Sequence, residues 1–129
     1  MGTAIKLTAE ESKGFFIDAL CNGMNQMNHY GLEWVIDENQ YKSARMQFGD
    51  ADSVYFESVI MKMLEMGYTI SLKDLNDGGY DSTISLDDVI NRVNLTPSNH
   101  IMDMMNGEDD STTADAIIQS VFYKEVIFG

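Results

Sequence analysis

Residues 68–88 have the sequence YTISLKDLNDGGYDSTISLDD, and this stretch decides the fold class. Ile70 and Leu72 alternate with polar residues, which is the periodicity of a β-strand that buries one face. The cluster Asn76-Asp77-Gly78-Gly79 is typical of a turn. Residues 80–84 are therefore predicted to return as the partner strand of a β-hairpin.

Helix signals occur on both sides of this hairpin. Thr8 and Glu11 form a capping box, in which two side chains bond the free backbone N–H groups at a helix start. Ser85 and Asp88 have the same spacing directly after the hairpin. Apolar residues recur at helical spacing behind such starts. The predicted helices are 9–27, 53–66, 86–94, 97–106 and 112–124, with a weaker helix at 39–48 and a short strand at 32–36.

The predicted ends of some helices depend on single residues. Asp52-Ser53 is predicted to start one helix, and Gly67 to end it. Thr96 is predicted as the N-cap of another helix, with Pro97 at its first position. The apolar residues 126–128 are expected to dock on the core, with a strand as one option. We therefore expect an α+β, helix-rich single domain over residues 1–129, with about five helices and a small antiparallel sheet or hairpin.

The acidic charge is concentrated in one part of the chain. Ten of the 42 residues from Asp74 to Asp115 are acidic and only Arg92 is basic, so this segment carries −9 of the net charge of −13. Such a field repels nucleic-acid backbone and anionic membrane, and it attracts basic surfaces or metal ions. The predicted partner-binding residues are Asp74, Asp77, Asp81, Asp87, Asp88, Asp103, Glu108, Asp109 and Asp110.

These features favour binding over catalysis. The leading hypothesis is a non-enzymatic acidic protein that engages a basic surface of a partner protein. In its sharper form, the chain is an inhibitor that mimics nucleic acid, because carboxylates along a surface reproduce the phosphate field. Small acidic viral counter-defence proteins that act on host nucleases provide an analogy for this class. The competing interpretation is that the charge only keeps the protein dispersed.

A calcium module is the first alternative. Residues 77–88 can be aligned with an EF-hand loop, in which Asp77, Asp81 and Asp88 would occupy ligand positions. Gly79 offers no side-chain ligand, and Ser82 replaces the glycine that the loop needs. The aspartate at the last position is also shorter than the usual bidentate glutamate. A hairpin turn followed by a capped helix is the favoured interpretation, and no specific calcium site is expected.

Catalytic chemistry has little support in the sequence. His29 and His100 are the only histidines and Cys21 is the only cysteine, and no phosphate-binding, dinucleotide or zinc motif occurs. We expect Cys21 to be a small buried residue and His100 to be a surface or capping residue. No cofactor is predicted. A single cysteine and the absence of an apolar signal segment near residue 1 favour a cytoplasmic protein. No apolar run reaches about 18 residues, so no membrane span is expected.

The methionines suggest a second alternative. The chain has ten, and methionine builds both irregular cores and adaptable binding surfaces. Met63 and Met105 have core spacing and are predicted to be buried. Met61, Met66 and Met102 fall off the apolar stripes. If exposed, they form an apolar patch within an acidic rim, which with the apolar C-terminal residues suggests homo-oligomerisation.

Overall fold

The hairpin predicted from residues 68–88 is present in the computed structural model, which describes residues 6–51 and 53–129. Strand β2 (Ile70–Asp74) pairs antiparallel with β3 (Ser82–Ile84), with Ile70 opposite Ile84. Strand β1 (Leu32–Val35) pairs antiparallel with the other edge of β2. The described residues thus contain a three-stranded antiparallel sheet of order β1-β2-β3.

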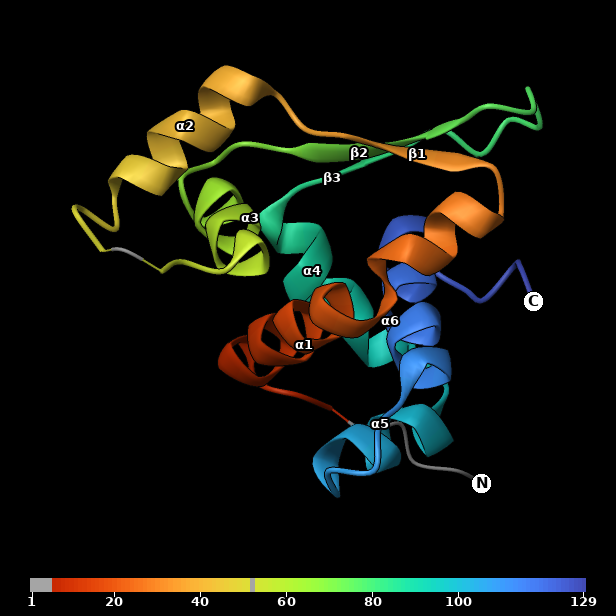
Figure 1. Cartoon of the computed structure of the whole chain (residues 1–129). Coiled ribbons are helices and arrows are strands. Elements are labelled where there is room, and N and C mark those ends of the chain that lie inside the picture. Colours follow the sequence, from red (N-terminus) through yellow and green to blue (C-terminus); the bar gives the residue numbers. More distant parts are fainter. Residues whose placement is uncertain (1–5, 52) are drawn as a thin grey trace.

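The helices lie mainly on one side of this sheet (Figure 1). In the view shown, α1 and α6 lie below the sheet, α5 lies at the end of the helical layer farthest from it, and α2 lies beside one end of the strands. The α+β, helix-rich fold predicted from the sequence is therefore confirmed. The helices of the described residues are α1 (Ala9–His29), α2 (Glu38–Met46), α3 (Phe56–Glu65), α4 (Leu86–Arg92), the 3₁₀ turn η1 (Val93–Leu95), α5 (Ser98–Met105) and α6 (Ser111–Tyr123).

Helix α6 is the centre of the core. It contacts α1, α4, α5 and β3, and Ala116–Phe122 is buried without interruption. Helix α1 contributes the buried stripe Phe16, Leu20 and Met27, which has the spacing of one helical face. Gly23 lies in this stripe against Ala114, because the absence of a side chain there lets α1 and α6 approach closely.

Trp34 joins the sheet to the helical layer. It lies on β1, and its indole N–H donates to the Met24 carbonyl of α1 at 3.0 Å. Its ring meets Phe122 of α6 edge to face, with ring centroids 5.5 Å apart. An aromatic ring with a polar edge is suited to such a junction, since the ring is partly buried against the core while the N–H finds an acceptor.

Two predicted helix starts are wrong. Helix α3 begins at Phe56, three residues after Ser53, and its N-cap Tyr55 makes no side-chain capping bond. Asp52, the other half of that predicted start, lies outside the described residues. Helix α5 has Pro97 as N-cap, not Thr96, and the buried Thr96 hydroxyl has no hydrogen-bond partner within the described chain. The Thr8–Glu11 and Ser85–Asp88 capping boxes are confirmed.

Burial corrects several side-chain predictions. Cys21 is exposed, because it falls outside the buried stripe of α1. Met63 is buried as predicted, but Met105 is 56% exposed and Met61 is only 4% exposed. Met66 and Met102 are exposed, at the end of α3 and on α5 respectively. Homo-oligomerisation through the predicted apolar surface stays a prediction.

The C-terminal residues dock on the core without forming a strand. The backbone N–H groups of Ile127 and Phe128 both donate to the side-chain oxygen of Gln119, each at 2.8 Å. A single buried side chain therefore anchors these residues to α6.

Candidate functional site

The acidic residues of the hairpin are organised by Asp74. It closes β2 and is 7% exposed. Its carboxylate accepts from the backbone N–H of Asn76 at 2.8 Å and of Tyr80 at 3.3 Å. A Cβ on Gly78 would lie 2.7 Å from Asp74 Oδ2, so a side chain at that position would displace the Asp74 carboxylate. Burial and these bonds give Asp74 a structural role, and they remove it from the exposed acidic face on which it was predicted.

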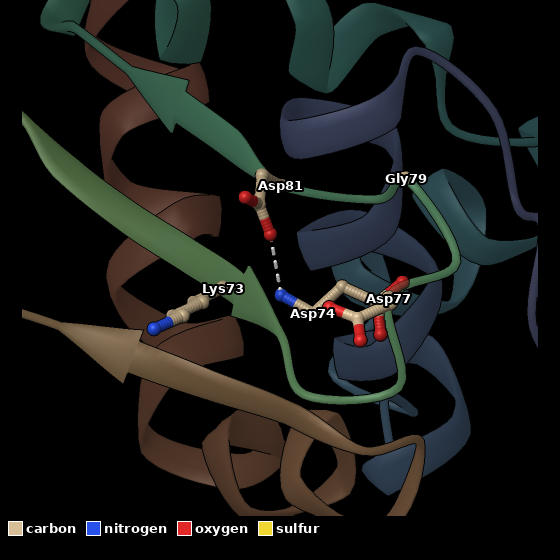
Figure 2. Close-up of a pocket in the computed structure, with 5 residues that line it drawn as sticks. All are labelled: Lys73, Asp74, Asp77, Gly79 and Asp81. Atoms are coloured by element: carbon tan, nitrogen blue, oxygen red, sulfur yellow. Dashed lines mark hydrogen bonds between the residues drawn. The ribbon is translucent and has the colours of Figure 1, made fainter.

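Asp77 and Asp81 are the exposed carboxylates of the same turn. Asp81 Oδ1 accepts from the Asp74 backbone N–H at 2.7 Å, and Asp77 adopts a left-handed backbone with φ of 54°. Together with Lys73, Asp74 and Gly79 they line a cavity of about 240 Å³. In Figure 2 the Lys73 ammonium points away from the three aspartates, so the cavity is predominantly negative.

The first turn of α4 contains the next acidic pair. Asp88 Oδ2 accepts from the Ser85 backbone N–H at 2.9 Å, and Asp88 Oδ1 pairs with Arg92 at 3.0 Å. Both oxygens are thus used within the helix that they cap. Asp87 is exposed, and it lines a separate cavity of about 230 Å³ with Glu65 of α3 and the adjacent backbone.

The third acidic group lies at the end of α5 and in the loop before α6. Asp103 is half-buried, Glu108 is exposed, and the Glu108 backbone N–H donates to the Asp103 carbonyl at 2.8 Å. Asp110 is the N-cap of α6, and the bond it accepts from the Thr113 backbone N–H lowers its pKa. Burial and then the charge of Asp109 raise the pKa of Asp18 on α1.

The predicted acidic residues therefore occupy three places and not one cluster. Figure 1 shows the β2–β3 loop and the α5–α6 loop at opposite ends of the molecule. Across residues 6–51 and 53–129, these carboxylates form no ion pair with lysine or arginine, with the single exception of Asp88. The buried Asp74 also has no such pair, and the seven remaining residues without one, all exposed or half-buried, are Asp77, Asp81, Asp87, Asp103, Glu108, Asp109 and Asp110.

The three candidate calcium ligands do not come together. Asp77 and Asp81 line the hairpin cavity, whereas Asp88 is bonded within the first turns of α4. In the part of the chain that the structure describes, no group of three or more His, Cys, Asp or Glu side chains is placed to hold a metal ion. The EF-hand alignment therefore does not correspond to a ligand set here.

A polar cavity that the sequence did not indicate lies between α1 and α6. Its volume is about 260 Å³, and its lining comprises Gln26, Tyr30, Ser111, Thr112, Asp115 and Gly129. The Tyr30 hydroxyl donates to Asp115 at 2.6 Å, and burial followed by this bond raises the Tyr30 pKa. Tyr30 and Asp115 are 85 residues apart, so no local pattern could have paired them.

Cys21 has an unreactive environment despite its exposure. Partial desolvation, followed by its contact with Glu57 on α3, raises the pKa of the thiol to about 11. At neutral pH the thiol is therefore protonated, and the thiolate is the nucleophilic form of cysteine.

No protein-family model matches the chain, and comparisons with curated proteins and with solved structures find no match. Among the helices of the described residues, none has the combined length and apolar character that crossing a lipid bilayer requires.

Proposed function

We propose that this chain is a non-enzymatic binding protein whose acidic loops engage a basic surface of a partner protein. The observation that carries the proposal is the set of seven carboxylates without an ion-pair partner in the described chain. Outside residues 74–115, Glu10, Glu38 and Glu65 are ion-paired and the other described carboxylates are not, so the segment is distinguished by its density of unpaired carboxylates. The unpaired carboxylates leave a negative field that a cationic partner neutralises.

Each acidic loop lies beside apolar residues that supply contact area. At the hairpin, Leu75 is 57% exposed and Tyr80 is 42% exposed. Near the α5–α6 loop, Met102 and Met105 are similarly exposed. Aromatic and methionine side chains within a charged rim have the composition of a protein-binding surface, in which buried anchors supply affinity and rim charges guide approach.

In the sharper form of the proposal, the partner is a nucleic-acid-binding protein and the chain acts as an inhibitor that mimics nucleic acid. Carboxylates on extended loops resemble backbone phosphates in charge, and they would compete for the same lysine and arginine side chains. We place this activity in the cytoplasm, because a reducing compartment suits a chain whose single thiol is exposed.

Capture of partners from the native host tests the proposal. The test variant carries Asp77→Asn and Asp109→Asn. The control variant carries Glu10→Gln and Glu38→Gln, which remove two carboxylates that are already ion-paired. Both variants change the net charge by the same amount. A partner that binds the wild type and the control but is lost from the test variant and at high salt supports the proposal.

If both variants capture the partner equally well, the acidic loops contribute only to the net charge, and the proposal is overturned. The sharper form is tested on the purified partner with a nucleic-acid duplex as competitor. If the duplex and the chain bind simultaneously, the chain does not occupy the nucleic-acid site.

A further inference from the structure

Two asparagines of the chain directly precede a glycine. Asn22-Gly23 lies in α1, and Asn106-Gly107 lies at the end of α5. Asparagine is chemically labile, because its side-chain amide can react with the backbone nitrogen of the next residue. A glycine in that position has no side chain to hinder the approach. The two dipeptides are identical, so a difference in their reactivity must come from the fold.

The fold protects Asn22-Gly23. Both residues lie in the interior of a helix of 21 residues, where the Gly23 N–H is bonded to the carbonyl one turn before it. Gly23 is buried against Ala114, and Asn22 Nδ2 donates to the Asp18 carbonyl at 3.2 Å. The reaction requires the backbone between the two residues to leave the helical conformation. Here that rotation would break the contact between α1 and α6.

Asn106-Gly107 lies at an exposed helix end. Both residues are exposed, and Gly107 has a left-handed backbone with φ of 71° and no atom within 4 Å of an added Cβ. The Gly107 N–H donates to the Met104 carbonyl at 3.2 Å, and the Glu108 N–H donates to the Asp103 carbonyl at 2.8 Å. This pair of bonds is the glycine cap that commonly ends a helix.

The cap of α5 opens more easily than the interior of α1. Helix α5 has eight residues and lies at the edge of the helical layer, at the end farthest from the sheet (Figure 1). The terminal turns of helices fray, and their local opening costs far less free energy than opening a segment of the core. The Gly107 nitrogen is therefore released from Met104 at a small cost, whereas the Gly23 nitrogen is not released without disrupting the core.

We propose that Asn106 is a deamidation site of the folded protein and that Asn22 is not. When the terminal turn of α5 opens, the Gly107 nitrogen loses its proton to solvent and forms a bond to Asn106 Cγ. The Cγ–Nδ2 bond breaks, and Nδ2 takes a proton from solvent and leaves as ammonia. The product is a cyclic succinimide. No electrons are transferred to or from the protein.

Water is the only co-reactant, and it opens the succinimide in two ways. Hydrolysis of the bond between the Gly107 nitrogen and Cγ gives aspartate at position 106. Hydrolysis of the bond between the same nitrogen and the backbone carbonyl carbon gives isoaspartate, in which the main chain runs through Cβ and Cγ. Both products carry a carboxylate where the amide had been.

Either product changes the end of α5. A fifth carboxylate joins Asp103, Glu108, Asp109 and Asp110 within residues 103–110. It lies at the C-terminal end of the helix, where the helix dipole disfavours negative charge. Isoaspartate also lengthens the main chain, which displaces the N–H groups of the cap from their acceptors. The chemistry does not depend on the function proposed for the acidic loops.

The experiment incubates the full, folded chain in mildly alkaline buffer and follows both asparagines by peptide mapping with mass spectrometry. A sample taken before incubation gives the background from digestion. We expect Asn106 to convert at least about tenfold faster than Asn22. In guanidinium chloride the two should convert at similar rates, because the fold no longer distinguishes them. An isoaspartyl methyltransferase should label the product at position 106.

Asn106→Gln is the test variant and Asn22→Gln is its matched control. Glutamine has one more methylene group, and the larger ring that it would form closes far more slowly. Both asparagines are exposed, so neither change should disturb the fold, which circular dichroism checks. Ion exchange should show the deamidated species accumulating in wild type and in Asn22→Gln but not in Asn106→Gln.

Two results would overturn the proposal. In the first, Asn22 converts as fast as Asn106 in the folded chain, so that α1 gives no protection. In the second, Asn106 stays intact in the folded chain over a period in which it converts in the unfolded chain, so that the cap of α5 protects it. Asn106→Asp reproduces the added charge and should lower the Tm, and an unchanged Tm would overturn the inferred effect on α5.

Discussion

Gly23 of α1 and Ala114 of α6 are in direct contact at the helix crossing, and a Cβ added to Gly23 would lie 2.8 Å from the Ala114 Cβ. Glycine inside a helix normally costs about 1 kcal/mol relative to alanine. Here overpacking, which costs about 1–3 kcal/mol, should exceed that gain. We expect Gly23→Ala to lower the free energy of unfolding, measured by urea denaturation.

Gly14 provides the control, because it lies in the same helix with no atom within 4 Å of an added Cβ. Gly14→Ala should raise the free energy of unfolding by about 0.5–1 kcal/mol. Adding Ala114→Gly to Gly23→Ala should recover part of the loss. A stabilising Gly23→Ala substitution would contradict the close helix approach.

Asp74 should matter for stability more than any exposed aspartate of the hairpin. Asp74→Ala leaves the backbone N–H groups of Asn76 and Tyr80 without their acceptor, and we expect a loss of about 2–4 kcal/mol. Asp77→Asn keeps a residue that tolerates the left-handed backbone, and it should change stability by less than about 0.5 kcal/mol. Thermal unfolding of both variants compares them, and equal effects would refute the structural role of Asp74.

Calcium should not bind specifically at the hairpin. Asp77 and Asp81 share a cavity there, but Asp88 is bonded to Ser85 and Arg92. Asp74 also lines this cavity, but both of its oxygens already accept backbone N–H groups, and the remaining carboxylate oxygens are fewer than the six to eight oxygens that Ca²⁺ takes. Titration calorimetry should therefore show no saturable heat. One-to-one binding that Asp77→Ala abolishes would restore the calcium alternative.

Cys21 should react slowly although it is exposed. With the pKa at about 11, the thiolate fraction at pH 8 is lower than that of a free cysteine by roughly tenfold for each unit of difference. Alkylation by iodoacetamide should be at least tenfold slower than in the chain unfolded by denaturant. Glu57→Gln removes a contact that favours the protonated thiol and should accelerate alkylation. Equal rates in the folded and unfolded chains would be inconsistent with this environment.

The two acidic loops should differ in their effect on a partner, because they lie at opposite ends of the molecule. If the partner binds at the α5–α6 loop, Glu108→Gln with Asp109→Asn should slow association more than it speeds dissociation, as expected of rim charges. Asp77→Asn with Asp81→Asn should then have little effect. Rates that fall steeply as salt shortens the Debye length from about 10 to 3 Å would identify electrostatic steering. If neither pair of substitutions changes the association rate, the acidic charge serves only to keep the protein soluble.

Local signals predicted the elements of this fold but not their mutual contacts. The Thr8–Glu11 capping box and the alternation in β2 depend on neighbouring residues, and both are confirmed. The start of α3 was missed because Tyr55 provides no capping side chain. The exposure of Cys21 could have been found, since the spacing of Phe16, Leu20 and Met27 already leaves it off the buried stripe.

The site residues were harder to predict, because their roles depend on distant partners. Asp74 resembles the other aspartates in sequence, and only the turn that folds back over it makes it structural. Gln119 has no sequence feature that indicates its bonds to residues 127 and 128. The acidic segment was recognised from composition, but composition contains no information on which loops share a face.

The position of Trp34 gives the protein an internal optical reporter. The chain has one tryptophan, and its ring lies where β1 meets α1 and α6. Its emission should therefore shift to longer wavelength when the sheet separates from the helices. Helix content measured by circular dichroism is insensitive to that separation. A refolding experiment that follows both signals would thus distinguish the formation of helices from their assembly with the sheet.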